Sequence, residues 1–496
     1  MRECPLSRIK DERGFMKQEN RRFDTEVQYL KYKVLKEVAK RTWQGNLLET
    51  ILDIPKEIAP GNTPAIRCCI YKERAILEER IKMAMGGDKS NPNVIEVIGI
   101  ACDECPAGGY EVGDACRGCL AHNCEYVCKF GAISFDEKSH VAKIDKSKCV
   151  ECGQCSRVCP YGAITHHTRP CEKACKIKAI YAGGETKEAK IDNSTCISCG
   201  NCVYHCPWGA ISDKSFICDV INMIKDSDGG KNYKVYAVIA PSISSQFAYA
   251  TQGQVIAGIK ALGFTDVIEA ALGADIVADE ESRELVSKGT LISSCCPAFL
   301  SHVEKQFPEL IPLLSQTLSP MAAICKLFKM KEPSSKFVFI GPCTAKKLEF
   351  QKDSVRDFVD SVITFEELQA LFGSRDIDIT LFNEESTIGA SSFGRNFARC
   401  GGLADAVREG ICEHGDNEFF ELKSISCNGI EQCVSALVKM KYGKLDANFI
   451  EGMACVGGCV GGAGCPVHST DKPKKDPLGN ETTTISDALK RVSEEK

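Results

Sequence analysis

The chain lacks an excess of charge of either sign, and it lacks long apolar runs. Its 62 Lys and Arg residues stand against 67 Asp and Glu, a formal net charge of −5, which gives no basic surface for nucleic acid. No segment approaches the roughly 20 consecutive apolar residues of a membrane-spanning helix, and the first residues do not resemble a signal peptide. We therefore expect a cytoplasmic protein that binds neither nucleic acid nor a membrane.

Nucleotide-binding fingerprints are also missing. No convincing G-x-G-x-x-G follows an expected strand, so no nicotinamide or flavin site is indicated. The glycine-rich run near Gly457 is not followed by the Lys-Ser/Thr pair of a phosphate-binding loop.

Cysteine, by contrast, is abundant, with 31 residues in 496. None lies in 5–67 or 219–294, whereas 102–218 holds most of them in short-spaced groups. A disulfide scaffold is the alternative explanation, but it is typical of small exported domains, and this chain is long, with 44% hydrophobic residues. Cytoplasmic thiols stay reduced, so the clustering indicates metal binding.

The pattern along the chain predicts three regions. Residues 1–95 are expected to be a helical N-terminal region, with charged helical stretches at 23–54 and 65–85. Residues 96–228 contain the clustered cysteines. Residues 229–496 alternate short apolar runs with helical segments, which predicts an α/β domain with mostly parallel sheets. The expected strands are 235–240, 266–269, 290–293, 336–340 and 448–451, and the expected helices include 253–261, 279–287 and 298–306.

Two cysteine groups have the spacing C-x2-C-x2-C-x3-C-P, which is the run of bacterial 4Fe-4S ferredoxins. In such runs the fourth cysteine serves the other cluster. The expected ligands of one cluster are Cys149, Cys152, Cys155 and Cys206. Those of the second are Cys196, Cys199, Cys202 and Cys159. Zinc is the alternative, but its sites usually need two pairs with a longer gap.

Eight more cysteines belong to looser groups of the same internal repeat. They are Cys116, Cys119, Cys124, Cys128, Cys171, Cys175, Cys102 and Cys105. Four cysteine groups run into similar endings, such as Gly131-Ala132-Ile133, and the unit resembles half of a bacterial ferredoxin. We therefore expect an α+β bacterial-ferredoxin-like module with one or two further 4Fe-4S clusters. The same crossing would join Cys175 to the group of Cys116, Cys119 and Cys124, and Cys128 and Cys171 to Cys102 and Cys105. Structural thiols or zinc are the alternative.

Three cysteine segments lie far apart in the C-terminal half. They are Ser293–Phe299, Gly341–Glu349 and Glu451–Gly464. Each follows an expected strand, so each is expected at a carboxyl strand end, where α/β sheets bind ligands. Four thiolates from three loops suit a buried iron–sulfur cube, neighbouring glycines allow close backbone approach, and Lys346 supplies a cationic donor.

In this order the three segments resemble the signature motifs of iron-only (FeFe) hydrogenases, over about residues 100–468. The resemblance implies an H-cluster, a 4Fe-4S cube bridged to a two-iron centre with carbonyl and cyanide ligands. The implied cube ligands are Cys296, Cys343, Cys455 and Cys459, with Cys459 shared between the two parts. Cys295 matches the proton-donating cysteine, and Lys346 matches the residue that hydrogen-bonds a cyanide. The implied pocket residues are Met453, Phe397 and Ser294.

The resemblance also implies a proton relay through Cys295, Glu281, Ser319 and Glu284. Glu281 and Glu284 are three residues apart and share a helix face. Asp279 and the acids after it are expected to open a helix, so the alternative is a favourable charged first turn.

Some positions depart from the family pattern. Ser293, Phe299 and Gly341 replace the usual Thr, Trp and Met, and Cys465 stands where a polar residue is common. This combination resembles the divergent class called group B. Five isolated cysteines are interpreted as core thiols, namely Cys325, Cys400, Cys412, Cys427 and Cys433.

The resemblance implies a monomeric enzyme that interconverts dihydrogen with protons and electrons. Electrons would pass through the 4Fe-4S clusters to or from ferredoxin or flavodoxin, and hydrogenase maturation proteins would install the H-cluster. Two other functions are kept as alternatives. One is a hydrogenase-like iron–sulfur assembly protein, which retention of Cys295 and Lys346 disfavours. The other is a sensory hydrogenase with slow turnover.

Overall fold

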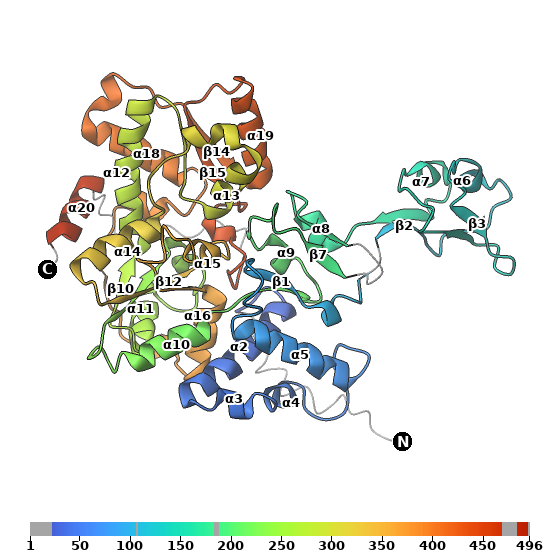
Figure 1. The fold of residues 1–496 in the computed structure, drawn as a ribbon, viewed down its shortest axis with the longest axis horizontal. Helices are drawn as coiled ribbons and strands as arrows, with labels where there is room; N and C mark the ends of the chain where they lie inside the picture. The colour runs from blue at the N-terminus through green and yellow to red at the C-terminus, as the bar shows by residue number, and fades with distance from the viewer. Residues whose placement is uncertain (1–21, 106–107, 183–187, 388, 469–483, 495–496) are drawn as a thin grey trace.

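The computed structural model describes residues 22–105, 108–182, 188–387, 389–468 and 484–494. Figure 1 shows a large body and a small lobe that stands away from it. The N-terminal helices and the C-terminal half of the chain form the body, and part of the cysteine-rich region forms the lobe. Among the described helices, none combines the length and apolar character needed to cross a membrane.

The described part of the N-terminal region is helical. Its helices are α2 (Glu26–Gln44), α3 (Leu47–Thr50), α4 (Ile54–Ile58) and α5 (Ile70–Ala84). The hydroxyl of Thr25 accepts a hydrogen bond from Gln28 N at the start of α2, and Gly45 ends the helix in the left-handed conformation. α2 packs against α5 and against α16 (Phe365–Ser374) in the C-terminal half.

The distal lobe (residues 109–167) is a pair of ferredoxin-like units. Strand β3 (Ile133–Phe135) pairs antiparallel with β4 (Ala142–Ile144), beside α6 (Asn123–Tyr126) and α7 (Gln154–Val158). Strands β2 (Gly109–Val112) and β5 (Ile164–His167) pair antiparallel at the base of the lobe and lead back to the body (Figure 1).

A second pair of such units lies against the body. It contains β6 (Ile180–Ala182) paired with β7 (Ala189–Ile191), β1 (Ile95–Val97) paired with β8 (Ile211–Asp213), and the short helices α8 (Pro170–Ala174) and α9 (Asn201–Tyr204). The repeat expected from sequence is present, because the isoleucine of each ending is buried at the first position of a strand. These residues are Ile133, Ile164, Ile180 and Ile211.

Two parallel sheets form the core of the C-terminal half, as the alternating pattern predicted. One has the order β10 (Asp266–Glu269), β9 (Val235–Ile239), β12 (Lys336–Gly341) and β13 (Ser361–Thr364). The other has the order β11 (Leu291–Ile292), β15 (Phe449–Met453) and β14 (Ser424–Asn428). Apart from β14, the strands of both sheets are mostly buried, which explains why most of them have apolar sequences.

Further helices pack around these sheets. They are α10 (Ile217–Asp226), α11 (Gln252–Ala261), α12 (Ala270–Lys288), α13 (Pro297–Gln306), α14 (Pro320–Lys331), α15 (Lys346–Glu349), α17 (Ser392–Asn396), α18 (Gly402–His414), α19 (Ile430–Lys441) and α20 (Ile485–Glu494). Short 3-10 turns lie at Gly99–Ala101, Pro241–Ser245, Pro308–Leu313, Ile379–Leu381, Asp416–Glu418 and Cys459–Gly461. The expectation that Asp279 opens a helix is wrong: α12 begins at Ala270, so the acids from Asp279 to Glu284 lie in its second half.

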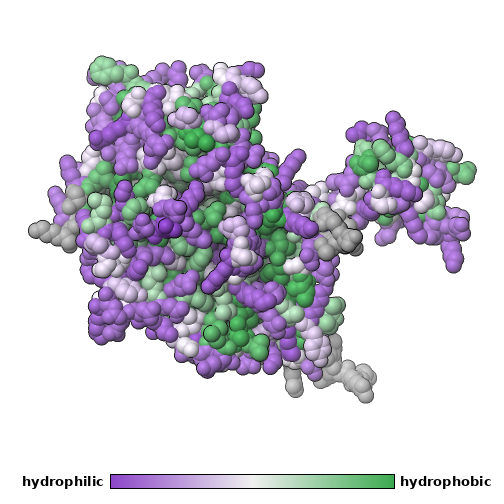
Figure 2. Space-filling model, viewed as in Figure 1, coloured by the Kyte–Doolittle hydropathy of each residue, from purple (hydrophilic) through white to green (hydrophobic). Residues whose placement is uncertain are grey.

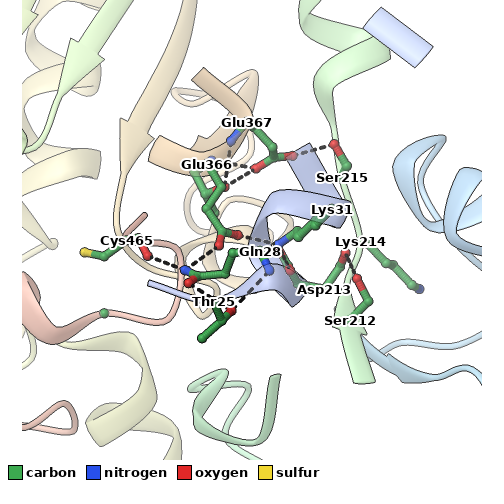
Figure 3. A network of polar contacts seen from close by, with 12 residues as sticks. Thr25, Gln28, Lys31, Ser212, Asp213, Lys214, Ser215, Glu366, Glu367 and Cys465 are labelled. Atoms are coloured by element: carbon green, nitrogen blue, oxygen red, sulfur yellow. Dashed lines mark hydrogen bonds and ion pairs between the residues drawn. The ribbon is translucent and has the colours of Figure 1, made fainter. Parts of the chain in front are cut away.

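A buried network of charges joins the three regions of the chain (Figure 3). The Lys31 ammonium of α2 lies 2.5 Å from a carboxylate oxygen of Asp213 and 2.7 Å from one of Glu366. Lys347 lies 2.8 Å from Asp213 and 2.7 Å from Glu367. The network therefore connects an N-terminal helix, the end of the cysteine-rich region and the segment that carries Cys343.

The surface of the molecule is mostly hydrophilic. In Figure 2 apolar residues gather beside the N-terminal helices and on the distal lobe. The large exposed apolar side chains of the lobe include Leu120, Tyr126 and Phe130.

Candidate active site

The three cysteine segments of the C-terminal half meet around one internal cavity. Each follows a parallel strand, namely β11, β12 and β15, and enters the space at the carboxyl ends of the two sheets. The cavity has a volume of about 90 Å³. Its lining includes Cys295, Cys296, Cys343, Cys455, Cys459, Lys346, Met453 and Phe397. The structure thus gathers almost all of the residues that the motifs predicted there.

The chemistry of these thiols fits an iron–sulfur cube. Burial raises the pKa of Cys343 to about 11 and that of Cys459 to about 12, and repulsion from Cys296 adds to both shifts. Buried thiolates held together in this way need a cationic group between them, which the iron of a cube supplies. Gly458 lets the third segment pack closely on the backbone of residues 398–400: it has φ +83°, and a Cβ there would lie 2.5 Å from the Ala398 carbonyl oxygen.

Lys346 places a positive charge at the cavity wall. Burial disfavours its charged form, but the Glu349 carboxylate, 2.6 Å from Nζ, outweighs burial and raises the pKa of Lys346. Met453 and Phe397 also line the cavity, as expected. Ser294 does not: its hydroxyl donates to the Thr317 carbonyl oxygen at 2.8 Å, so its expected role as a pocket residue is not supported.

Aromatic rings pack at two of the positions that depart from the family pattern, Gly341 and Phe299. A Cβ on Gly341 would lie 2.5 Å from the ring of Phe339, and that ring lines the cavity. Phe299 packs on Gly452, where a Cβ would lie 2.1 Å from its ring. Sequence reasoning missed Phe339. The available signal was its position two residues before Gly341, which places both on the same face of β12.

A buried carboxyl group lies behind Cys295. Glu281, in the middle of α12, is fully buried and accepts a hydrogen bond from Ser294 N at 3.4 Å. Burial raises the pKa of Glu281 to about 8, and Glu284 and Glu451 repel its charge further. Burial also raises the pKa of the Cys295 thiol, and the neighbouring Glu281 adds to this effect. Both groups therefore favour their protonated forms at neutral pH.

The expected serine of the relay is corrected by the structure. Ser315 donates its hydroxyl to Glu284 at 2.9 Å and is the hydroxyl that contacts Glu281. Ser319 instead accepts a hydrogen bond from Ala322 N as the N-terminal cap of α14. Lys288, one turn after Glu284, lies 2.6 Å from its carboxylate near the surface. The polar path thus runs through Ser315.

In the distal lobe, the cysteine pairing differs from the expected one. Burial raises the pKa of Cys124, and repulsion from Cys119 and Cys159 adds to this rise. Cys128 lines a small cavity with Cys149, Cys152 and Cys155. The first two cysteine groups therefore exchange their fourth cysteines with each other, so the expected contact of Cys206 with the group of Cys149 is wrong.

The remaining cysteines pair in the module against the body. Cys199 and Cys202 have Cys175 beside them, so Cys175 does not join the group of Cys116. The other four cysteines, which face one another, are Cys102, Cys105, Cys171 and Cys206. Cys199 also lines the internal cavity and faces Cys343 and Cys455. The cysteine groups thus form a row from the lobe to the cavity.

The corrected pairing predicts the effect of one substitution. Cys159→Ser is expected to disturb the cluster of Cys116, Cys119 and Cys124, because Cys159 completes that group, and to spare the cluster of Cys149. Electron paramagnetic resonance of the reconstituted protein would measure this, with Cys412→Ser as control, because Cys412 is exposed and not in the core as expected. Damage confined to the cluster of Cys149 would contradict the pairing.

Comparisons with known families agree with this geometry. The family described as the iron only hydrogenase large subunit, C-terminal domain, matches residues 233–463. A 4Fe-4S dicluster domain matches 115–163, and a 4Fe-4S double cluster binding domain matches 148–209. The first of the cluster domains spans the two groups that the structure pairs in the lobe.

Individual relatives point the same way. The chain is 30% identical to the Periplasmic Fe hydrogenase large subunit of Nitratidesulfovibrio vulgaris, over 67% of this chain and 87% of that protein. It is 29% identical to Iron hydrogenase 1 of Clostridium pasteurianum, over 52% of this chain, and spans only 54% of that protein's length.

Two further similarities are weaker or shorter. The Cytosolic Fe-S cluster assembly factor NAR1 of Kluyveromyces lactis is 36% identical over 20% of this chain and 21% of that protein. An apo FeFe hydrogenase structure from Chlamydomonas reinhardtii is 22% identical with a TM-score of 0.40, covering 55% of this chain and 87% of that one. Motifs, site geometry and the long match in Nitratidesulfovibrio vulgaris lead to one conclusion: the chain belongs to the iron-only (FeFe) hydrogenase family.

Proposed function

We propose that this chain is a hydrogenase that interconverts dihydrogen with protons and electrons. The observation that carries the proposal is the buried path of Cys295, Glu281, Ser315 and Glu284, which leads from the cysteine-lined cavity toward the surface. An assembly protein needs thiolates to hold a cluster, but it has no use for a buried chain of protonatable groups.

The cavity would hold the H-cluster, with Cys296, Cys343, Cys455 and Cys459 as ligands. When bound, this group supplies the redox chemistry of dihydrogen. Met453, Phe397 and Phe339 form an apolar wall that excludes water, and Lys346 presents an ammonium group to anionic ligands. Cys295, beside the ligand Cys296, presents its thiol to the cavity.

The protein groups behind Cys295 move the proton. With a pKa of about 8, Glu281 keeps its proton at neutral pH and can both receive and return one. The Ser315 hydroxyl connects Glu281 to Glu284. Glu284 forms an ion pair with the half-exposed Lys288, which makes Glu284 the group nearest solvent.

The row of cysteine groups suits electron exchange with an outside carrier. We infer that the distal lobe meets ferredoxin or flavodoxin, since the lobe stands away from the body and places its cysteines far from the cavity (Figure 1). We also infer that maturation proteins install the H-cluster and that the enzyme works in the cytoplasm as a monomer. Residues 1–95, 96–228 and 229–496 are the proposed divisions of the chain.

An assembly function is the second candidate, because of the similarity to NAR1 proteins. A dihydrogen assay after anaerobic expression, with and without the family's maturation enzymes, separates the two. Infrared spectra for bound carbonyl and cyanide would accompany it. Turnover and infrared bands that depend on maturation are expected; matured protein without either would support assembly instead.

The serine of the proton path gives a sharper test. Ser315→Ala should lower turnover by about 10²-fold, since the hydroxyl between Glu281 and Glu284 is lost. Ser319→Ala should leave turnover nearly unchanged but lower the free energy of unfolding by about 1 kcal/mol, because it removes a helix cap. Dihydrogen evolution and thermal unfolding measure the two effects. The reverse result would restore Ser319 to the path.

A further inference from the structure

Three buried arginines surround the cysteine group closest to the N-terminal helices. Arg80 lies on α5, Arg67 lies just before that helix, and Arg169 lies at the start of α8. Arg67 is 9% exposed, Arg80 is 7% exposed and Arg169 is 1% exposed. In the described part of the distal lobe, by contrast, no lysine or arginine is buried.

The guanidinium groups lie around Cys102, Cys105, Cys171 and Cys206. Nη1 of Arg169 is 3.8 Å from Cys102 Sγ. Arg67 and Arg169 lie within electrostatic reach of the Cys105 thiol, and Arg80 lies within reach of the Cys206 thiol. Arg80 Nη2 donates to the Trp208 carbonyl oxygen at 3.0 Å, and Arg67 lies over the Trp208 ring at 4.8 Å.

The acidic groups described near Arg67 and Arg80 do not balance the charges of these two residues. Asp103 and Glu104 each lie 3.9 Å from Arg67, but they are at the surface and also pair with Lys72. Burial lowers the pKa of Arg80 to about 10, so Arg80 stays charged at neutral pH. Glu172 faces Cys171, yet its oxygens accept backbone hydrogen bonds from Arg169 and Ala182.

Buried positive charge of this kind requires a buried anion. An isolated ion in the protein interior costs several kcal/mol unless an opposite charge compensates it. Arg80 Nε and Arg67 Nη1 are buried without a hydrogen-bond acceptor in the described structure. Neutral thiols would leave this charge uncompensated, whereas thiolates that bind a metal cluster would compensate it.

We propose that Cys102, Cys105, Cys171 and Cys206 bind a fourth accessory 4Fe-4S cluster, and that the three arginines give it the highest reduction potential of the accessory clusters. With four thiolates, an oxidised cube of core charge 2+ has a net charge of −2. One electron reduces the core to 1+ and the net charge becomes −3. Fixed positive charges nearby stabilise the more negative state, so they favour reduction.

The position of this site suggests its use. Cys171 faces Cys202, so the site adjoins the group of Cys199, which in turn borders the cavity. An electron that passes between the lobe and the cavity would therefore be held at this cluster. This last step rests on the proposed hydrogenase function; the cluster and its potential do not.

Metal analysis tests the cluster itself. The double variant Cys102→Ser/Cys171→Ser, compared with the wild-type chain after anaerobic reconstitution, should lose the iron and sulfide of one cube and one paramagnetic signal. The other cluster signals should remain. Unchanged iron content, or zinc in the wild-type site, would overturn the proposal.

Redox titration tests the arginines. The wild-type protein is titrated with dithionite as electron donor and no dihydrogen. The paramagnetic signal that the double variant lacks should appear first, at the highest potential. Arg80→Met should shift its midpoint to a more negative potential, and Arg80→Lys, which keeps the charge, should retain most of the wild-type value. Lys82→Met, an exposed position on the same helix, should have no effect.

Two results would refute the role of the arginines: a midpoint that is the same in Arg80→Met and wild type, or an equal shift in Arg80→Lys. Unaltered signals from the distal clusters show that each variant is folded. Because the titration needs no turnover, a failure of the proposed hydrogenase function would leave these results interpretable.

Discussion

Glu281→Gln and Cys295→Ala are each expected to lower dihydrogen turnover by about 10²- to 10⁴-fold, the range for loss of a positioned acid or base. Glu281 is buried, its pKa is raised to about 8, and it lies between the thiol side of the cavity and Ser315. Glutamine keeps the shape and the hydrogen bond from Ser294 but cannot exchange a proton. Dihydrogen evolution and oxidation rates would measure the loss.

The cofactor should survive both substitutions, since neither residue is a predicted ligand. Carbonyl and cyanide infrared bands are therefore expected at wild-type intensity. Asp279→Asn is the matched control on α12: its carboxylate pairs with Arg283 at 3.1 Å and His414 at 3.0 Å, on a partly exposed part of the helix, and the effect should be mild. Near-normal turnover in both relay variants would mean that protons use another path.

Cys459→Ala should abolish the carbonyl and cyanide bands altogether. Cys459 lines the cavity with Cys296, Cys343 and Cys455, and it is the thiolate that the family motif assigns to both parts of the H-cluster. Turnover should fall to background for the same reason. Infrared spectroscopy of matured protein is the direct measurement.

The accessory clusters provide the internal control for this variant. Their cysteines lie outside the cavity, apart from Cys199 at its edge, so their paramagnetic signals should persist. Cys465→Ser is a matched substitution, because Cys465 is also buried close to Cys459 but donates its thiol to the Val460 carbonyl oxygen. Full infrared intensity in Cys459→Ala would refute the ligand assignment.

The sequence predicted which cysteines form local groups better than it predicted which groups lie together. Spacing identifies which thiols can bind the irons of one cluster, because this depends only on a short segment of the chain. It does not reveal which repeat lies beside which, since this depends on tertiary packing. The two near-ideal runs suggested that Cys149 and Cys206 share a cluster, whereas the structure pairs neighbouring repeats and separates the pairs by β2 and β5.

Short-range chemistry explains the other corrections. Ser319 stands before Pro320, a typical cap and first residue of a helix, and it is used as a cap. Ser315 carries no motif of its own and reaches Glu284 only through the fold. Likewise, Asp279 resembled a helix start because acids favour first turns, but the apolar residues from Ala270 extend α12 backward.

The parallel sheets were predictable because their strands are continuous apolar runs. β9, β10, β12 and β15 lie close to the expected ranges. β13 and β14 were missed. β13 (Ser361–Thr364) has only two apolar residues, and β14 (Ser424–Asn428) is mixed in polarity and only partly buried at its start, so neither has that signal. Phe339 was missed because its ring can fill the cavity only where the neighbouring position on the same strand face, Gly341, has no side chain.

The buried charges of Lys31, Asp213, Lys347, Glu366 and Glu367 limit how the gene can be cut or recombined. A fragment beginning at 229 would leave Lys347 without Asp213 and Glu366 without Lys31. Breaking one buried pair costs about 3–5 kcal/mol, which is comparable to the roughly 5–15 kcal/mol that keeps a domain folded. A fragment or chimera that is to keep these ion pairs must therefore include α2 and β8.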